Sequence, residues 1–186
     1  MLLHKLTTSL ILMCTTILPA SASDAPVIRS HEDRLNAVIN DLTLLTTDYL
    51  FLHEAIKEFR GQAFAFNTID TYERMVEAHL RDSISDAAAC PSLDDDESRR
   101  VMDALAKPHP DFLQELLDSI TARKPQFDHI NKADEVLKWL QNLYGLSNQL
   151  PLALEEKVGA ADAEEIEGER LWRNELFEYH IAMYSM

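Results

Sequence analysis

The residues best suited to metal binding or redox chemistry do not occur at the required spacings in this sequence. The histidines are scattered singly, with no HExxH motif and no two of them four residues apart. A zinc site would therefore need histidines that converge from separate segments. Glu77 lies two residues before His79, whereas a helical di-iron site needs glutamate and histidine three residues apart. Glu178 and His180 have the same unsuitable spacing, so we predict no metal site and no cofactor.

Motifs for covalent catalysis and for calcium binding are also missing. The sequence contains no G-x-S-x-G, and no histidine neighbours Cys90. The acidic run over 94–97 lacks the turn glycine and the final glutamate of a calcium loop, and it suits the start of a helix. We therefore predict a protein that is not an enzyme and has no catalytic residues. A hydrolase site assembled from distant side chains stays open as an alternative.

The apolar residues recur every three or four positions along most of the chain, which indicates helices with one buried face. Ser30 with Asp33 resembles a capping box at the start of the first helix. We expect an all-α fold, a single bundle of five or six helices with a long first helix and kinked later helices. The expected helices cover 31–60, 68–88, a segment beginning at 94, 111–127, 134–158 and 162–184. In the last helix, the residues expected to face inward are Ile166, Leu171, Leu176, Tyr179 and Met183.

Two prolines favour a cavity inside this bundle. Pro125 and Pro151 should kink their helices and open gaps between them. Pockets between bundle helices are mostly apolar, and each buried methylene of an acyl chain contributes about 0.8 kcal/mol. A filled core is the alternative explanation of the same apolar stripes. The residues predicted to line an apolar ligand cavity are Tyr49, Leu52, Ile56, Phe59, Ile69, Tyr72, Val76, Leu113, Leu116, Leu117, Ile120, Leu140 and Leu143.

The charge balance excludes some partners. The chain of 186 residues has 17 basic and 32 acidic residues, for a net charge of −15. A surface this acidic repels nucleic-acid phosphates and anionic lipid headgroups, so we predict no nucleic-acid partner.

The first 22 residues are typical of a secretory signal peptide. Lys5 precedes an apolar run, and Ala20, Ser21 and Ala22 fit the small-residue cleavage pattern. The run is shorter than the roughly 20 residues of a membrane span, so we predict no transmembrane segment and an extracellular location. The bundle domain would then cover 23–186. Its one cysteine, Cys90, favours a buried apolar filler, with a reactive thiol as the alternative.

The middle of the chain carries a family resemblance. Leu116, Leu117 and Ile120 are followed by the run 122–125 (ARKP) and by Phe127, with further apolar stretches at 136–140 and 153–158. This pattern resembles the fungal hydrophobic surface-binding protein A family, also described as cell wall galactomannoproteins.

The resemblance implies secreted or wall-associated helical proteins without catalytic residues, some of which hold fatty acids in a central cavity. It also implies binding to hydrophobic surfaces and recruitment of polyester-degrading enzymes. The sequence departs from the family in being more acidic and in lacking a Ser/Thr-rich, lipid-anchored tail. The leading hypothesis is therefore a secreted protein that binds a fatty acid or other apolar ligand. The alternative is adsorption to hydrophobic surfaces, with recruitment of a secreted hydrolase, through an exposed apolar patch.

Overall fold

The computed structural model describes residues 30–109 and 111–186, which fold into seven α-helices without a strand. The all-α prediction is confirmed, and the predicted signal peptide over 1–22 lies outside the described residues. The helices are α1 His31–Glu58, α2 Ala63–Ala89, α3 Asp95–Leu105, α4 Phe112–Ala122, α5 Lys124–His129, α6 Ala133–Glu155 and α7 Ala160–Ser185.

The helix count exceeds the predicted five or six because the helix expected over 111–127 is divided. Arg123 departs from helical geometry, with φ −94° and ψ 3°, and separates α4 from α5. Pro125 then lies in the first turn of α5, where a missing N–H costs no helical hydrogen bond. Pro151, in contrast, lies inside α6, which continues through it.

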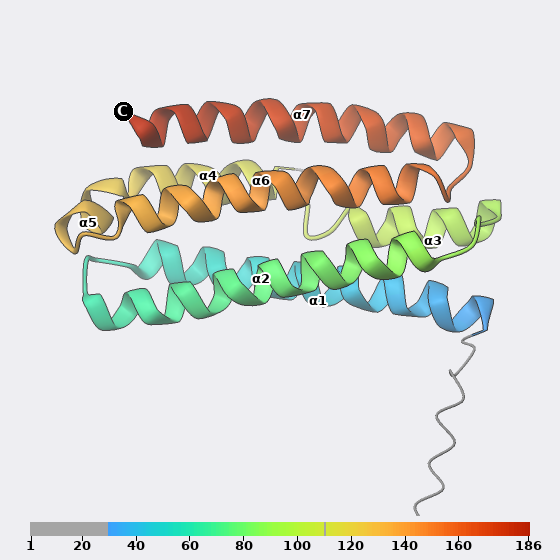
Figure 1. Cartoon of the computed structure of the whole chain (residues 1–186), viewed down its shortest axis with the longest axis horizontal. Helices are drawn as coiled ribbons and strands as arrows, with labels where there is room; N and C mark the ends of the chain where they lie inside the picture. Colours follow the sequence, from blue (N-terminus) through green and yellow to red (C-terminus); the bar gives the residue numbers. More distant parts are fainter. Residues whose placement is uncertain (1–29, 110) are drawn as a thin grey trace, which may run out of the picture.

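The helices form a closed ring around one core (Figure 1). α1 and α2 make a hairpin, α6 lies beside α2, and α7 lies beside α6. α3 and α4 follow one another along the bundle, and both lie between α7 and α1. Four long helices and one pair of short helices in line therefore surround the buried apolar side chains. No helix in the described part of the chain is long and apolar enough to cross a bilayer.

α2 begins five residues earlier than expected, at Ala63 instead of 68. The backbone carbonyl of Gln62 accepts hydrogen bonds from the N–H groups of Ala65 and Phe66, so the segment expected to be a loop forms the first turn. Phe66 is buried and stacks on Trp139 with 5.0 Å between ring centroids, whereas Phe64 is 77% exposed. Packing of Phe66 between helices explains why this segment is helical.

α7 buries a face that matches the expected one only in part: Ile166 is buried and Leu176 is half-buried, as predicted. Leu171, Tyr179 and Met183 are exposed, and the inward positions belong instead to Phe177 and His180, among others. The apolar residues of α7 are distributed around the helix, so their periodicity alone does not decide which side packs against the core. Contact with both α6 and α4 selects the buried side.

Candidate functional site: a cavity inside the bundle

A cavity of about 230 Å³ lies inside the ring, beside the junction of α3 and α4. Its wall comes from α1, α2, α6, α7 and the segment from the end of α3 to the start of α4. Most of the surface is apolar, which suits a hydrocarbon ligand. The main apolar side chains of the wall are Leu42, Leu45, Leu80, Leu105, Phe112, Leu113 and Leu150.

The cavity exists because the ring position shared by α3 and α4 has no helix between the end of α3 and the start of α4. α3 ends at Leu105 and α4 begins at Phe112, so non-helical chain closes the wall between them. The sequence over 107–110 is Lys-Pro-His-Pro, and the two prolines are incompatible with a helix continuing through this segment. The thinner chain leaves space where side chains of a continuous helix would fill the core. Residues 106–109 and Pro151 border the cavity, whereas Pro125 does not.

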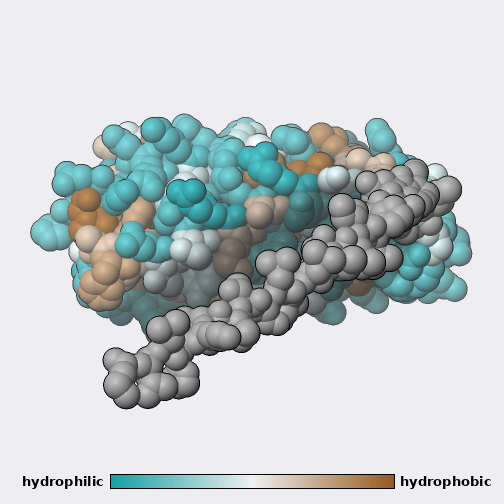
Figure 2. Space-filling view, turned by 60° about the horizontal axis from the view of Figure 1, so that its bottom comes forward, coloured by the Kyte–Doolittle hydropathy of each residue, from teal (hydrophilic) through white to brown (hydrophobic). Residues whose placement is uncertain are grey.

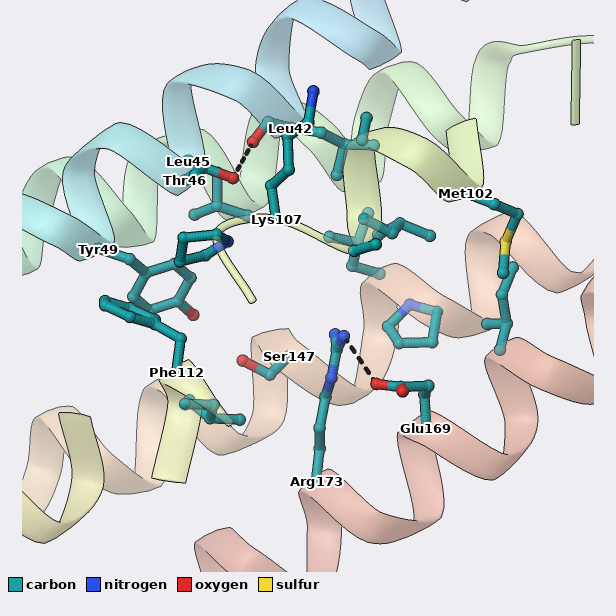
Figure 3. Close-up of a pocket in the computed structure, with 18 of the residues that line it drawn as sticks. Leu42, Leu45, Thr46, Tyr49, Met102, Lys107, Phe112, Ser147, Glu169 and Arg173 are labelled. Atoms are coloured by element: carbon teal, nitrogen blue, oxygen red, sulfur yellow. Dashed lines mark hydrogen bonds and ion pairs between the residues drawn. The ribbon is translucent and has the colours of Figure 1, made fainter. Parts of the chain in front are cut away.

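Polar groups project into the cavity from three helices (Figure 3). The Arg173 guanidinium of α7 lies in the middle of the space, with Ser147 of α6 beside it. Arg173 Nη2 donates to Glu169 Oε2 at 3.2 Å, one turn away on the same helix. Only part of the guanidinium's donor capacity is used in this way, because arginine has five N–H groups.

Tyr49 closes one end of the cavity, with Ser147 nearby (Figure 3). The Tyr49 hydroxyl group is hydrogen-bonded to the Ser147 side chain. Burial raises the pKa of Tyr49, and the Ser147 hydrogen bond and the Arg173 charge partly oppose that shift. The carboxylate of Glu73 raises the same pKa further. The phenol therefore lies between two ionisable groups, Arg173 in the cavity and Glu73 deeper in the core.

A second, much smaller void of about 10 Å³ lies deeper in the core, beyond Tyr49. Apolar residues of α1, α4, α5 and α6 line most of it, and Glu73 of α2 supplies its one acidic group. Glu73 is 3% exposed, and none of the described residues pairs with its Oε1 atom.

The predicted cavity residues divide into three groups in the structure. Tyr49 and Leu113 line the main cavity. Those that line the deeper void are Leu52, Ile56, Ile120, Leu140 and Leu143. Those that line neither space, being packed in the core or, for Tyr72, stacked on Phe51, are Phe59, Ile69, Tyr72, Val76, Leu116 and Leu117.

The sequence prediction missed the polar residues of the site and the segment that creates it. Arg173 and Ser147 are single polar residues in amphipathic helices, and nothing in their spacing distinguishes them from surface residues. The Lys-Pro-His-Pro segment was a usable signal, because it marks the interruption of a helical position.

The structure places two histidines beside hydroxyl groups, but neither pair lines the cavity. His180 Nδ1 lies 2.9 Å from Thr121 Oγ1, and His53 Nε2 lies 3.1 Å from Ser119 Oγ. Both pairs tie α4 to a neighbouring helix, to α7 and α1 respectively. In the part of the chain that the structure describes, no group of three or more His, Cys, Asp or Glu side chains could hold a metal ion.

Comparison with known proteins gives a family and three similar folds. The profile of the family described as hydrophobic surface binding protein A matches residues 35–156. The crystal structure of Afmp4p in complex with palmitic acid has 26% sequence identity and a TM-score of 0.77, covering 81% of this chain and 99% of that one. No curated protein is significantly similar in sequence.

Two domains of the Penicillium marneffei MP1 protein share the fold. Ligand binding domain 2, complexed with multiple arachidonic acids, has 13% identity and a TM-score of 0.66, covering 84% of this chain and 97% of that one. Ligand binding domain 1, complexed with arachidonic acids, has 14% identity and a TM-score of 0.61, covering 83% of this chain and 96% of that one.

Proposed function

Because the chain belongs to the hydrophobic surface binding protein A family, we propose that it is a secreted, non-enzymatic protein that binds a long-chain fatty acid inside its bundle. The observation that carries the proposal is an apolar cavity with an arginine in its middle. The palmitic acid held by Afmp4p, a similar fold, supports the choice of ligand. The signal-peptide pattern over 1–22 supports secretion, and association with a cell wall is an expectation from the family resemblance.

In this proposal the apolar walls hold the acyl chain and α7 holds the carboxylate. Burial of each methylene contributes about 0.8 kcal/mol, so the chain supplies most of the affinity. The Arg173 guanidinium donates to the ligand carboxylate through the N–H groups that Glu169 leaves unused, and the Ser147 hydroxyl adds a donor.

Glu165 and Glu169 lie at the exposed edge of the cavity, opposite in charge to Arg173 and Lys107. The local charges therefore balance, and recognition of a carboxylate depends on the position of Arg173 rather than on a net positive field. Because Glu169 competes for the same guanidinium, the ion pair also keeps Arg173 oriented in the empty site.

Binding of a fluorescent fatty acid, displaced by unlabelled palmitic acid, tests the proposal on delipidated protein. Arg173→Ala should weaken binding about tenfold, the amount expected for loss of a charge-assisted hydrogen bond worth roughly 1.5 kcal/mol. Arg74→Ala is the matched control, because Arg74 also pairs with a carboxylate one turn away, Asp70, but on the exposed surface of α2. Absence of fatty-acid uptake by the wild-type protein would overturn the proposal.

A second candidate function is adsorption to hydrophobic surfaces, and one feature of α7 favours it. Trp172, Tyr179 and Met183 fall on one side of this helix and are exposed. We call these three residues the outer α7 stripe. Other hydrophobic side chains are scattered, and one face of the molecule shows only small separate hydrophobic patches among hydrophilic residues (Figure 2).

Depletion of the protein from solution by polystyrene beads tests this second function. Replacing Tyr179 and Met183 together by serine should reduce adsorption and leave fatty-acid binding unchanged, because neither residue lines the cavity. Leu50→Ser, at a similarly exposed position of α1, serves as the control. Equal adsorption of all three proteins would rule out the outer α7 stripe as the adsorbing surface.

A further inference from the structure

Glu73 is a buried carboxyl group that the proposed fatty-acid site does not use. It lies on the inner side of α2, four residues after Ile69 and three before Val76, both fully buried. Its Oε1 atom has no partner among the described residues, and its side chain borders the deeper void. An unpaired polar atom in an apolar core costs about 1–3 kcal/mol, so an unmet hydrogen bond at this position calls for a ligand group.

The rest of the carboxyl group is held in place by its neighbours. Glu73 is hydrogen-bonded to Glu77, which accepts from the side-chain amide of Asn142 and pairs with Arg81. Burial, together with the negative charge of Glu77, raises the pKa of Glu73 to about 8. The group is therefore protonated near neutral pH, and a neutral carboxyl can both donate and accept a hydrogen bond inside an apolar void.

The void continues the cavity along the bundle. On α1 the cavity lining runs from Leu42 to Tyr49, and the void lining follows from Leu52 to Ile56. At 1.5 Å per residue, the cavity extends about 10 Å along α1 and the two spaces together extend about 20 Å. The same order holds on α6, where Ser147 borders the cavity and Leu143, one turn away, borders the void.

These lengths show why a ligand would reach Glu73. An extended palmitate chain is about 18 Å long at the roughly 1.2 Å per bond of a fully extended chain, which exceeds the length of the cavity alone. With the carboxylate at Arg173 and the acyl chain directed along α1, the distal half of the chain extends past Tyr49, whose ring lines the cavity. Joining the two spaces would require the Tyr49 ring and the apolar side chains that line the void to move, because the void alone measures about 10 Å³.

We propose that the void is the inner subsite of the ligand cavity, and that Glu73 selects acyl chains carrying a hydroxyl group in their distal half. The inference rests on the proposed fatty-acid binding and adds the class of ligand. A plain alkyl chain in this position leaves the Glu73 Oε1 atom unpaired, whereas a hydroxyl group supplies the missing partner. The void by itself has room for about one water molecule, so a ligand hydroxyl that takes this place also replaces its hydrogen bonds.

Competition binding with four unlabelled ligands tests this selectivity: palmitic acid, and its β-hydroxy, mid-chain hydroxy and ω-hydroxy derivatives. The wild-type protein should bind at least one of the two distal derivatives about three- to tenfold more tightly than palmitic acid, the gain expected from one buried hydrogen bond. The β-hydroxy derivative should gain nothing, because its hydroxyl group stays near Arg173.

Two variants of Glu73 identify the residue responsible. Glu73→Leu should abolish the preference for the distal hydroxyl group while still binding palmitic acid, because leucine is apolar and can form no hydrogen bond. Glu73→Gln should keep the preference, because the amide still donates and accepts. Circular dichroism and thermal unfolding would establish that both variants are folded, and the glutamine variant stays informative if leucine disturbs the core.

The outcomes separate this inference from the proposed function. If palmitic acid and all hydroxy derivatives bind the wild-type protein equally, the selectivity is overturned and fatty-acid binding stands. If the distal preference survives in Glu73→Leu, another residue recognises the hydroxyl group and the role of Glu73 is overturned. If no fatty acid binds, the proposed function itself fails.

Discussion

The Tyr49 hydroxyl group is hydrogen-bonded to Ser147, and this pair links α1 to α6 at the inner end of the cavity. Both residues line the cavity that contains Arg173, and about one turn away on the same helices Leu52 and Leu143 line the void that contains Glu73. A side chain that is tied by one hydrogen bond and borders open space can rotate at modest cost, because such a bond contributes only about 1 kcal/mol. Tyr49 is therefore suited to act as a movable partition between the two spaces.

Loss of the Tyr49 hydroxyl group should speed ligand entry into the deeper void. In Tyr49→Phe the ring keeps its size but loses the bond to Ser147, so we expect a several-fold faster association of palmitic acid in stopped-flow measurements. Tyr72→Phe is the matched control, since Tyr72 stacks on Phe51 and lines neither space. Identical association rates in both variants and the wild type would show that the hydrogen bond does not limit entry.

Filling the cavity should remove binding without unfolding the protein. Ala104 lies at the end of α3 and lines the cavity, so the ring of Ala104→Phe would occupy ligand space. We expect at least a tenfold loss of palmitic acid affinity with a melting temperature close to that of the wild type, because the added volume enters an existing space. The control Ala78→Phe adds the same ring on the exposed side of α2. Unchanged affinity in Ala104→Phe would place the ligand elsewhere.

The raised pKa of Glu73 makes stability depend on pH in a defined direction. The pKa rises from 4.5 in the unfolded chain to about 8 in the folded protein, through burial and through Glu77 and Asp70, with Arg74 opposing. The folded state then binds more protons than the unfolded state between these values, so the free energy of unfolding should fall as pH rises. The contribution of Glu73 to this slope should approach about 1.4 kcal/mol per pH unit.

Urea unfolding between pH 5 and pH 8 measures this slope in the wild type and in Glu73→Gln. The glutamine variant cannot ionise and should lose this contribution, whereas Glu58→Gln, at an exposed position, should keep it. A wild-type slope that is the same in Glu73→Gln would mean that other groups cause it.

The buried histidine of α7, His180, should make the folded protein less stable at acid pH. Burial lowers the pKa of His180 below 6.5, and Asp118, 3.5 Å from its Nε2, opposes the shift only in part. The unfolded state then binds more protons than the folded state as pH falls below 6.5, so stability should decrease toward pH 5. His180→Gln should reduce this loss in thermal unfolding, and exposed His129→Gln should not. An equal acid loss in both variants would exclude His180 as its source.

Local signals in the sequence were sufficient to predict most of the helices and the all-α class of the fold. The capping box of Ser30 and Asp33 is present at the start of α1, and the apolar stripe of that helix is buried as expected. Helical periodicity and caps act within a few residues, so they can be recognised without knowledge of the partners. The exceptions are positions where tertiary contacts overrule local preference, as at the early start of α2, where Phe66 packs on Trp139.

The sequence by itself determined that this protein is a helical bundle with apolar inner helix faces and an acidic exterior, because both properties follow from composition and spacing. Only the tertiary structure decided where the cavity lies and which polar groups enter it. The cavity lies at the ring position shared by α3 and α4, where helix is missing between the two. It can be recognised only when all five ring positions are assembled. Arg173 and Glu73 resemble surface residues in the sequence, and the positions of Arg173 in the cavity and of Glu73 in the core depend on helices far away in the chain.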